Sequence, residues 1–398
     1  MSPYLRNALV LGLLSAVGPF AIDMYLPALP AIAADLHAST FGTQLTLAAF
    51  FIAFGVCQIV YGPVSDMAGR KPPLYVGLVL FVLGSVGCAF APGIEALIAA
   101  RVVQGVGAAS VMVIPRAIIR DLHTGIEATK LMSLIMLVIS VSPILAPLVG
   151  SALIVPFGWR AVFAAIGATA LVSLALLAFV QTETHPVEKR MPLRVGAIAS
   201  GFATLLRDPR FLALTFVGGF GMASFFAFIS TASFVYIGHY GLTPTQFSLS
   251  FGVNAVGFIG ASQFAAALGS RFGSERVITT ALVSYAFFAL LLLALTLAGV
   301  DRFAVLAALL FLAFANLGLV IPTTMVLALD DHGPVAGLAS ALGGTLQMVT
   351  GAAMIGVAGA FFDGTPKPMV VAIALCAVSA LVLALVTPAP REAAVPAE

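Results

Sequence analysis

Long apolar stretches recur along this chain, separated by short clusters of proline, glycine and charged residues. A helix needs about 20 residues to cross the roughly 30 Å hydrocarbon core of a bilayer, and each stretch is about that long. The pattern therefore predicts an all-α membrane protein with twelve transmembrane helices. The first six are expected near residues 7–30, 42–64, 73–91, 95–119, 131–155 and 161–181, and the last six near 211–237, 246–268, 277–299, 303–328, 336–361 and 369–387.

Composition supports a chain that lies almost wholly in the membrane. Of the 398 residues, 61% are hydrophobic and 9% are charged, and the mean hydropathy is +1.13. Soluble domains carry roughly 25% charged residues, so a soluble fold is excluded. The net charge of +2 and the dispersed basic residues give no reason to expect nucleic acid as a partner.

The longest polar stretch, residues 182–210, divides the twelve segments into two sets of six. We therefore expect an N-terminal six-helix half (1–181), a cytoplasmic linker (182–210), a C-terminal six-helix half (211–387) and a cytoplasmic tail (388–398). Paired halves of this kind place a binding site at their interface near mid-membrane, with alternating access by rocking of one half against the other.

The positions of lysine and arginine predict the orientation. Fourteen of them fall on the side that holds both termini, and only Arg160, Arg302 and Lys367 fall on the other side. Because cytoplasmic loops retain positive charge during insertion, both termini are expected in the cytoplasm.

Asp23 and Arg101 are the only formal charges well inside apolar segments. Such groups cost at least about 2.5 to 3.5 kcal/mol at the bilayer centre, so a functional role is the default hypothesis. Counted along their helices at 1.5 Å per residue, both lie roughly 10 Å below the outer surface, where they could meet directly or share a water. Either they couple transport to protons, or they form a static pair that holds the first and fourth helices together.

Polar and aromatic residues in the spans are candidates for the wall of a substrate cavity. The second half has no formal charge inside any helix, and an apolar cavity with few polar groups suits uncharged, amphiphilic ligands. The candidates are Tyr25, Gln104, Phe225, Phe228, Tyr236, Asn254, Asn316 and Gln347.

Five motifs resemble those of a known family, the major facilitator superfamily. The segment 62–72 is similar to its loop signature, with Met67 where arginine is usual, and 97–109 and 142–150 are similar to its fourth-helix and antiporter motifs. The segments 22–30 and 116–121 resemble the Bcr/CflA subfamily of drug:proton antiporters.

The resemblance implies the major facilitator fold and export of small drug-like or antibiotic molecules from a bacterium, across its inner membrane. Protons would drive the export, so no cofactor is expected, and the partners would be an amphiphilic small molecule, protons and the bilayer. A monomer is expected.

The loop signature also implies a conformational latch. Its residues would be Gly62, Asp66, Gly69, Arg70, Arg120 and Asp121. Asp66 would face the N-terminus of the helix that begins near Gly337 in the outward-facing state, where a helix dipole favours an anion. The alternative is that the charges of this loop only set the topology.

Other functions would leave different motifs in the sequence. Proton-coupled uptake or efflux of a metabolite would use the same fold. No Gly-Lys dipeptide is present, so a P-loop is excluded and an ATP-driven pump is disfavoured. The five histidines are scattered, and the three cysteines lack ligand spacing, so we expect neither an enzyme nor a metal site.

Overall fold

The computed structural model describes residues 3–123, 125–190, 195–330 and 332–387, and it contains twelve helices long and apolar enough to cross a membrane. The first span is α1 (Pro3–Asp23), continued by η1 (Leu26–Ala28) and α2 (Leu29–Asp35). The rest of the first six are α3 (Thr40–Ala68), α4 (Lys71–Ala89), α5 (Ile94–Leu122), α6 (Gly125–Phe157) and α7 (Arg160–Phe179).

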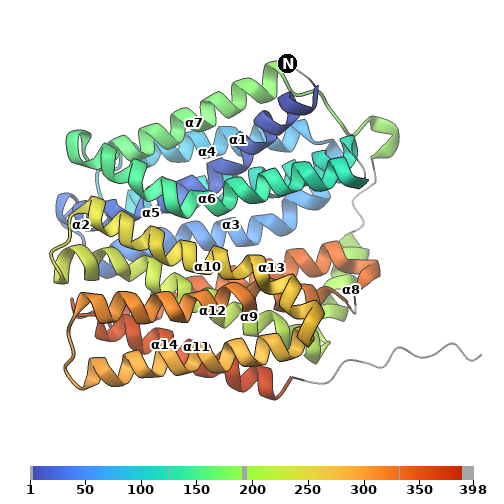
Figure 1. Cartoon of the computed structure of the whole chain (residues 1–398). Coiled ribbons are helices and arrows are strands. Elements are labelled where there is room, and N and C mark those ends of the chain that lie inside the picture. The colour runs from blue at the N-terminus through green and yellow to red at the C-terminus, as the bar shows by residue number, and fades with distance from the viewer. Residues whose placement is uncertain (1–2, 124, 191–194, 331, 388–398) are drawn as a thin grey trace, which may run out of the picture.

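The second six spans begin with α9 (Pro209–Ser233), which continues as a π-helical segment, η3 (Phe234–His239). They go on with α10 (Pro244–Phe272), α11 (Ser274–Leu297), α12 (Phe303–Asp330), η4 (Gly333–Val335) followed by α13 (Ala336–Ala360), and α14 (Lys367–Leu385). The predicted all-α fold with twelve spans is confirmed. Figure 1 shows the first six spans as one layer above the last six.

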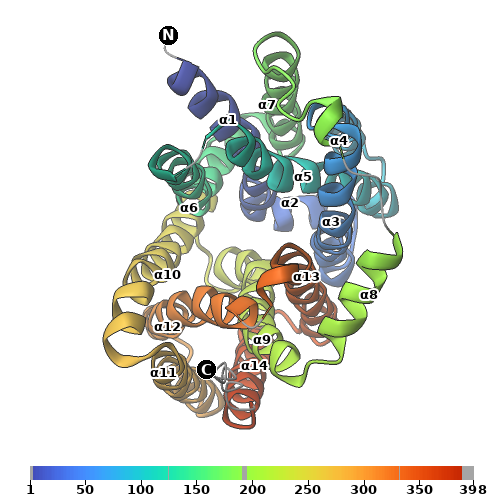
Figure 2. The ribbon, with the colours of Figure 1, turned by 90° about the vertical axis from the view of Figure 1, so that its right-hand side faces the viewer.

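The polar stretch between the halves contains structure that the sequence pattern did not predict. It holds η2 (Val187–Lys189) and α8 (Val195–Leu206), a 12-residue apolar helix that packs against α9 and α13. Charges at both ends of this stretch hid the short apolar run between them. Figure 1 shows α8 at the right-hand end of the bundle, and Figure 2 views the bundle from that end; we call it the linker end and the opposite end the far end.

The loop signature is also more helical than expected. Gly62 and Pro63 lie inside α3, which ends only at Ala68, and the turn is confined to Gly69 and Arg70. A membrane helix tolerates an internal proline when neighbouring groups satisfy the freed backbone. Gly69 has φ +94°, and a Cβ there would lie 2.7 Å from Arg190 Nη2, so glycine is required at that point of the turn.

Small residues let helices approach closely within each half. A Cβ on Gly105 of α5 would lie 2.5 Å from the Phe50 carbonyl oxygen of α3, and one on Gly107 would lie 2.6 Å from the Phe81 backbone nitrogen of α4. Hydrocarbon is as apolar as the side chains, so helix association in a membrane depends on such close van der Waals packing.

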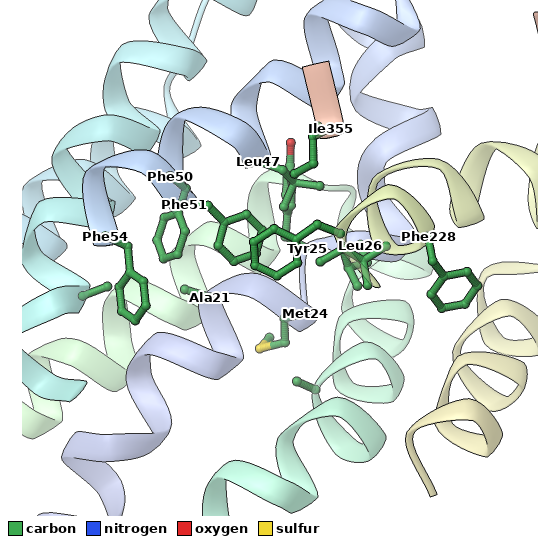
Figure 3. Packing of buried hydrophobic residues seen from close by; sticks show 14 of the residues in the cluster. Ala21, Met24, Tyr25, Leu26, Leu47, Phe50, Phe51, Phe54, Phe228 and Ile355 are labelled. Atoms are coloured by element: carbon green, nitrogen blue, oxygen red, sulfur yellow. The ribbon is translucent and has the colours of Figure 1, made fainter. Parts of the chain in front are cut away.

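The two halves meet in the middle of the bundle and at the far end. Gln44 Nε2 of α3 donates to the Ser230 carbonyl of α9 at 3.1 Å, and Thr345 Oγ1 of α13 donates to the Gly55 carbonyl of α3 at 2.6 Å. The rings of Phe51 and Phe226 stack across the halves at 3.9 Å. Figure 3 shows Leu47 of the first half close to Ile355 of the second half in this packed region.

Towards the linker end the halves separate. A groove of about 740 Å³ lies between α5 and α6 of the first half and α10 of the second. Because the contacts that join the halves lie from the middle of the bundle to the far end, this arrangement is open toward the linker end.

The close contact of α4 and α5 predicts a stability effect. Gly107→Ala should destabilise the protein by about 1 to 3 kcal/mol, because the added methyl overpacks the contact with Phe81 and Gly77. The melting temperature is measured by heating the protein with a thiol-reactive dye, which reacts with the buried thiols of Cys88 and Cys376 as unfolding exposes them. Gly260→Ala is the matched control, since nothing lies within 4 Å of its new Cβ. Equal melting temperatures for the two variants would contradict the packing argument.

Candidate functional site

Asp23 lies at the C-terminal end of α1, where the first span is interrupted before η1. Only 7% of its surface is exposed, and Ser142 Oγ of α6 donates to its Oδ2 at 3.2 Å. A buried carboxylate needs such partners, because burying an unpaired charge is costly. The carboxylate therefore joins the first span to α6.

Helix α6, which holds the Asp23 carboxylate, also contacts the second half. Five residues after Ser142, the Pro147 carbonyl accepts a hydrogen bond of 2.8 Å from Ser248 Oγ of α10. Further along, a Cβ on Gly150 would collide with the Met24 carbonyl, so α6 lies directly against the break in the first span. One side-chain contact and five residues of α6 thus separate Asp23 from a hydrogen bond between the halves.

Arg101 is fully buried in α5 and is held by neutral groups. Its Nη1 donates to the Gln104 Oε1 at 2.5 Å and to the Ala21 carbonyl at 3.2 Å. Its guanidinium lies 4.2 Å from the ring centre of Phe50 and 4.8 Å from that of Tyr25, distances at which a ring face attracts a cation. Within the described part of the chain, Nε and Nη2 of Arg101 have no hydrogen-bond partner.

The direct contact between Asp23 and Arg101, one of the arrangements expected from their depth, is not formed. Arg101 reaches the Ala21 carbonyl, only two residues from Asp23, so the two groups do lie at similar depth. Two residues correspond to about 200° around a helix, so Ala21 faces α5 while Asp23 faces α6. Depth was readable from the sequence, but the direction of the side chain around the helix was not.

Two of the predicted cavity residues belong to the surroundings of Arg101. Tyr25 is fully buried and its hydroxyl hydrogen-bonds to Thr46 Oγ1. Gln104 is also fully buried, and its Nε2 donates to Ser85 Oγ at 2.8 Å. Both therefore position Arg101 in this arrangement, and their contact with a substrate stays a prediction.

The aromatic candidates of the second half lie together. Phe228 stacks on Phe251 at 5.7 Å and contacts both Phe225 and Tyr236, with ring centres 6.4 and 6.1 Å away. Phe228 and Tyr236 are fully buried, whereas Phe225 is half-buried. Of the three, Phe225 has the most surface available to a ligand.

The polar candidates of the second half are dispersed. The Tyr236 hydroxyl lies beside Asn254, but neither that hydroxyl nor Asn254 Oδ1 completes a hydrogen bond of normal geometry. Gln347 of α13 lies against Gly218 of α9, and its Nε2 has no partner. Asn316 donates to the Leu312 carbonyl of its own helix at 2.8 Å. Buried groups without partners are free to bond to a ligand.

At the linker end, the loop signature forms a charge cluster within the first half. Arg70 donates to Asp66 Oδ1 at 2.6 Å and to Asp121 Oδ2 at 2.7 Å. The Asp66 side chain is 55% exposed, and in the described residues it makes no contact with the start of α13. The contact that the predicted latch requires is therefore not formed in this arrangement, and the latch stays a prediction. Arg120 lies outside this cluster.

Glu183 is a member of this region that the sequence analysis missed. Its carboxylate accepts from the backbone N–H of Arg70 at 2.9 Å and of Lys71 at 3.0 Å, at the N-terminus of α4. Burial raises the pKa of Glu183, but backbone N–H groups outweigh this and hold the pKa below its ordinary value. The available signal was a carboxylate directly after the last span of the first half.

Comparisons with known proteins agree with this architecture. A family model described as Major Facilitator Superfamily matches residues 11–355. The chain is 37% identical to an uncharacterized MFS-type transporter, YdgK, of Bacillus subtilis over 87% of each chain. It is 33% identical to a bicyclomycin resistance protein homolog of Haemophilus influenzae over 93% of each chain. A solved structure of a D-xylose-proton symporter shares the fold, with a TM-score of 0.74, 18% identity and 97% of each chain covered. The chain therefore belongs to the Major Facilitator Superfamily.

Proposed function

We propose that this chain is a secondary active transporter of a bacterial inner membrane that exports small amphiphilic, drug-like molecules in exchange for protons. The observation that carries it is the contact of the buried Asp23 carboxylate with Ser142 on α6, the helix that bonds across to the second half. Protonation of an ionisable group placed there can alter the contacts between the halves.

The coupling follows from what the carboxylate can do. When Asp23 is ionised it accepts the hydrogen bond of Ser142, and when it is protonated this charge-assisted bond weakens. Loss of the Ser142 hydrogen bond would loosen the contact of α1 with α6. Because α6 also carries the Pro147 carbonyl, this would weaken the hydrogen bond from Ser248 that joins the halves. Proton binding would therefore shift the balance between the two open states.

The substrate class rests on the second half and on the relatives. Within the described spans of that half, the candidate site offers aromatic rings and neutral amides rather than charges, which suits an amphiphile. The name of the Haemophilus relative refers to resistance to bicyclomycin, a role that export of a drug would supply. The symporter of similar fold shows that the fold alone does not determine this.

Asp23→Asn is the principal test of coupling. The amide keeps the size of the side chain but cannot ionise, so proton-driven export against a gradient should fall at least about tenfold, while downhill exchange in proteoliposomes persists. If proton and substrate compete, substrate binding by the wild type weakens at low pH and the variant loses this dependence.

Asp301→Asn is the control for the coupling test, because Asp301 pairs with His239 at 2.7 Å and lies outside the first half. Its export should match that of the wild type. If Asp23→Asn still concentrates substrate at the wild-type rate, Asp23 is structural and the coupling proposal fails.

The orientation predicts labelling from one side of the membrane. We expect the linker end in the cytoplasm, so a cysteine at Arg276 should be protected from an impermeant maleimide in intact cells, and a cysteine at Asp301 should react. Both positions are exposed, so accessibility within the protein does not decide the result. Labelling of the first and protection of the second would reverse the proposed orientation.

The latch hypothesis predicts a kinetic effect of a substitution at Asp66. Asp66→Asn should slow transport several-fold without weakening substrate binding, because Asp66 acts on the closure of the linker end and lies away from the candidate cavity residues. Turnover and equilibrium binding, measured on the same purified sample, separate these effects. Met67→Arg restores the residue usual in the signature and should leave transport unchanged. A parallel loss of binding and turnover in Asp66→Asn would argue against a latch.

A further inference from the structure

Two arginines near the linker end of α5 have no acidic partner. Arg116 and Arg120 are four residues apart and so lie on one face of the helix. Among the described residues, Arg116 makes one weak hydrogen-bond contact, from Nη2 to Met112 Sδ at 3.9 Å, and its buried Nε has no partner there. In the part of the chain that the structure describes, no carboxylate pairs with either guanidinium.

The nearby carboxylates are already engaged. Asp121 binds Arg70 and accepts a hydrogen bond from Thr184 Oγ1, and Glu127 pairs with His123 at 2.9 Å. Lys130, at the start of α6, adds a third cation. This corner of the linker end therefore gathers three cations that form no ion pair with a described carboxylate.

One of these cations, Arg120, lines the groove between the halves, and Arg116 lies one helical turn away on the same face of α5. Arg120 and Ile119 of α5 line one end, and the wall continues along α6 from Thr129 to Ser140, facing Ile259 and Gln263 of α10. The twelve residues from Thr129 to Ser140 make this wall about 16 Å long, comparable with a fatty-acid chain. Most of the surface within the groove is apolar.

The groove is accessible from the lipid side. Its residues Leu137 and Met136 are 58% and 39% exposed, and the neighbouring Phe264 of α10 is 63% exposed. Figure 2 shows α6 and α10 next to each other at the edge of the bundle, where the two halves meet. Such apolar surface on a spanning helix is covered by acyl chains.

We propose that the α5, α6 and α10 groove is a binding site for an anionic phospholipid of the linker-end leaflet. Its phosphate is held by Arg120 and Arg116, and one acyl chain lies between α6 and α10. Basic pockets between helices at the cytoplasmic face are suited to anionic headgroups, and an arginine fork matches a phosphate. A lipid in this position separates the halves at the linker end, so its binding favours this open state over the closed one.

The test uses the full-length protein with Leu137→Trp as a reporter at the rim of the groove. The only native tryptophan, Trp159, lies at the far end, and protein without the reporter supplies its baseline. In mixed micelles, phosphatidylglycerol with brominated chains should half-quench the reporter at about tenfold lower mole fraction than brominated phosphatidylcholine, because charge-assisted hydrogen bonds favour the anionic headgroup.

The arginines are tested in the reporter background. Arg116→Gln with Arg120→Gln should abolish the preference for phosphatidylglycerol, and Arg120→Gln alone should reduce it. The single variant changes an exposed side chain, so it keeps the test valid if the double variant does not fold. Arg271→Gln with Arg276→Gln removes the same charge from the other half at the same end and should preserve the preference.

Two further arms identify the occupant. Inorganic phosphate should not reverse the quenching, because it has no acyl chain to fill the groove. Displacement of the brominated lipid by a soluble anionic drug-like compound at micromolar concentration would instead make the groove a substrate site and overturn the lipid assignment. Equal quenching by the two lipids, or a preference that survives the double substitution, would also overturn it. None of these readouts measures transport, so failure here leaves proton-coupled export untouched.

Discussion

A bilayer offers no hydrogen bonds to the groups inside it, and this constraint explains where the polar side chains of the spans lie. Arg101 is enclosed by an amide, a backbone carbonyl and aromatic rings, and Asp23 is tied to the hydroxyl of Ser142. Asp23 and Arg101 thus each join two or more helices. Under the proposed coupling, protonation would alter a contact that also holds this half together.

The two ends of the bundle differ in how the halves are held. In the middle and at the far end, hydrogen bonds between side chains and backbone carbonyls cross directly from one half to the other, as from Gln44 to Ser230. At the linker end, the charge cluster of Arg70, Asp66 and Asp121 stays within the first half. A transporter needs contacts that form alternately at its two ends, and this distribution is what one of its two states requires.

The proposed lipid site beside Arg116 and Arg120 would make a membrane lipid a second ligand that affects the equilibrium between the open states. Arg120 lines the groove where the halves separate, and Arg116 lies one turn away on the same face of α5. Under the two proposals, a proton at Asp23 and a lipid in the groove would bias the same equilibrium from different places in the first half: the proton would loosen the α1 to α6 contact, and the lipid would occupy the gap beside α6. Their effects would then be coupled through this shared helix, because two ligands that prefer different states of one protein change each other's affinity reciprocally.

The sequence by itself determined the twelve spans, because apolar length is a local property and a membrane helix satisfies its own backbone. It also singled out Asp23, Arg101 and the loop signature, since charges in apolar segments are conspicuous. It did not reveal that Asp23 faces Ser142 rather than Arg101, because that depends on the rotation of α1 against α5 and α6. Glu183, α8 and the unpaired arginines beside the groove acquire their roles only when distant segments come together. Side-chain direction and helix packing are tertiary properties, and only the folded structure decided them.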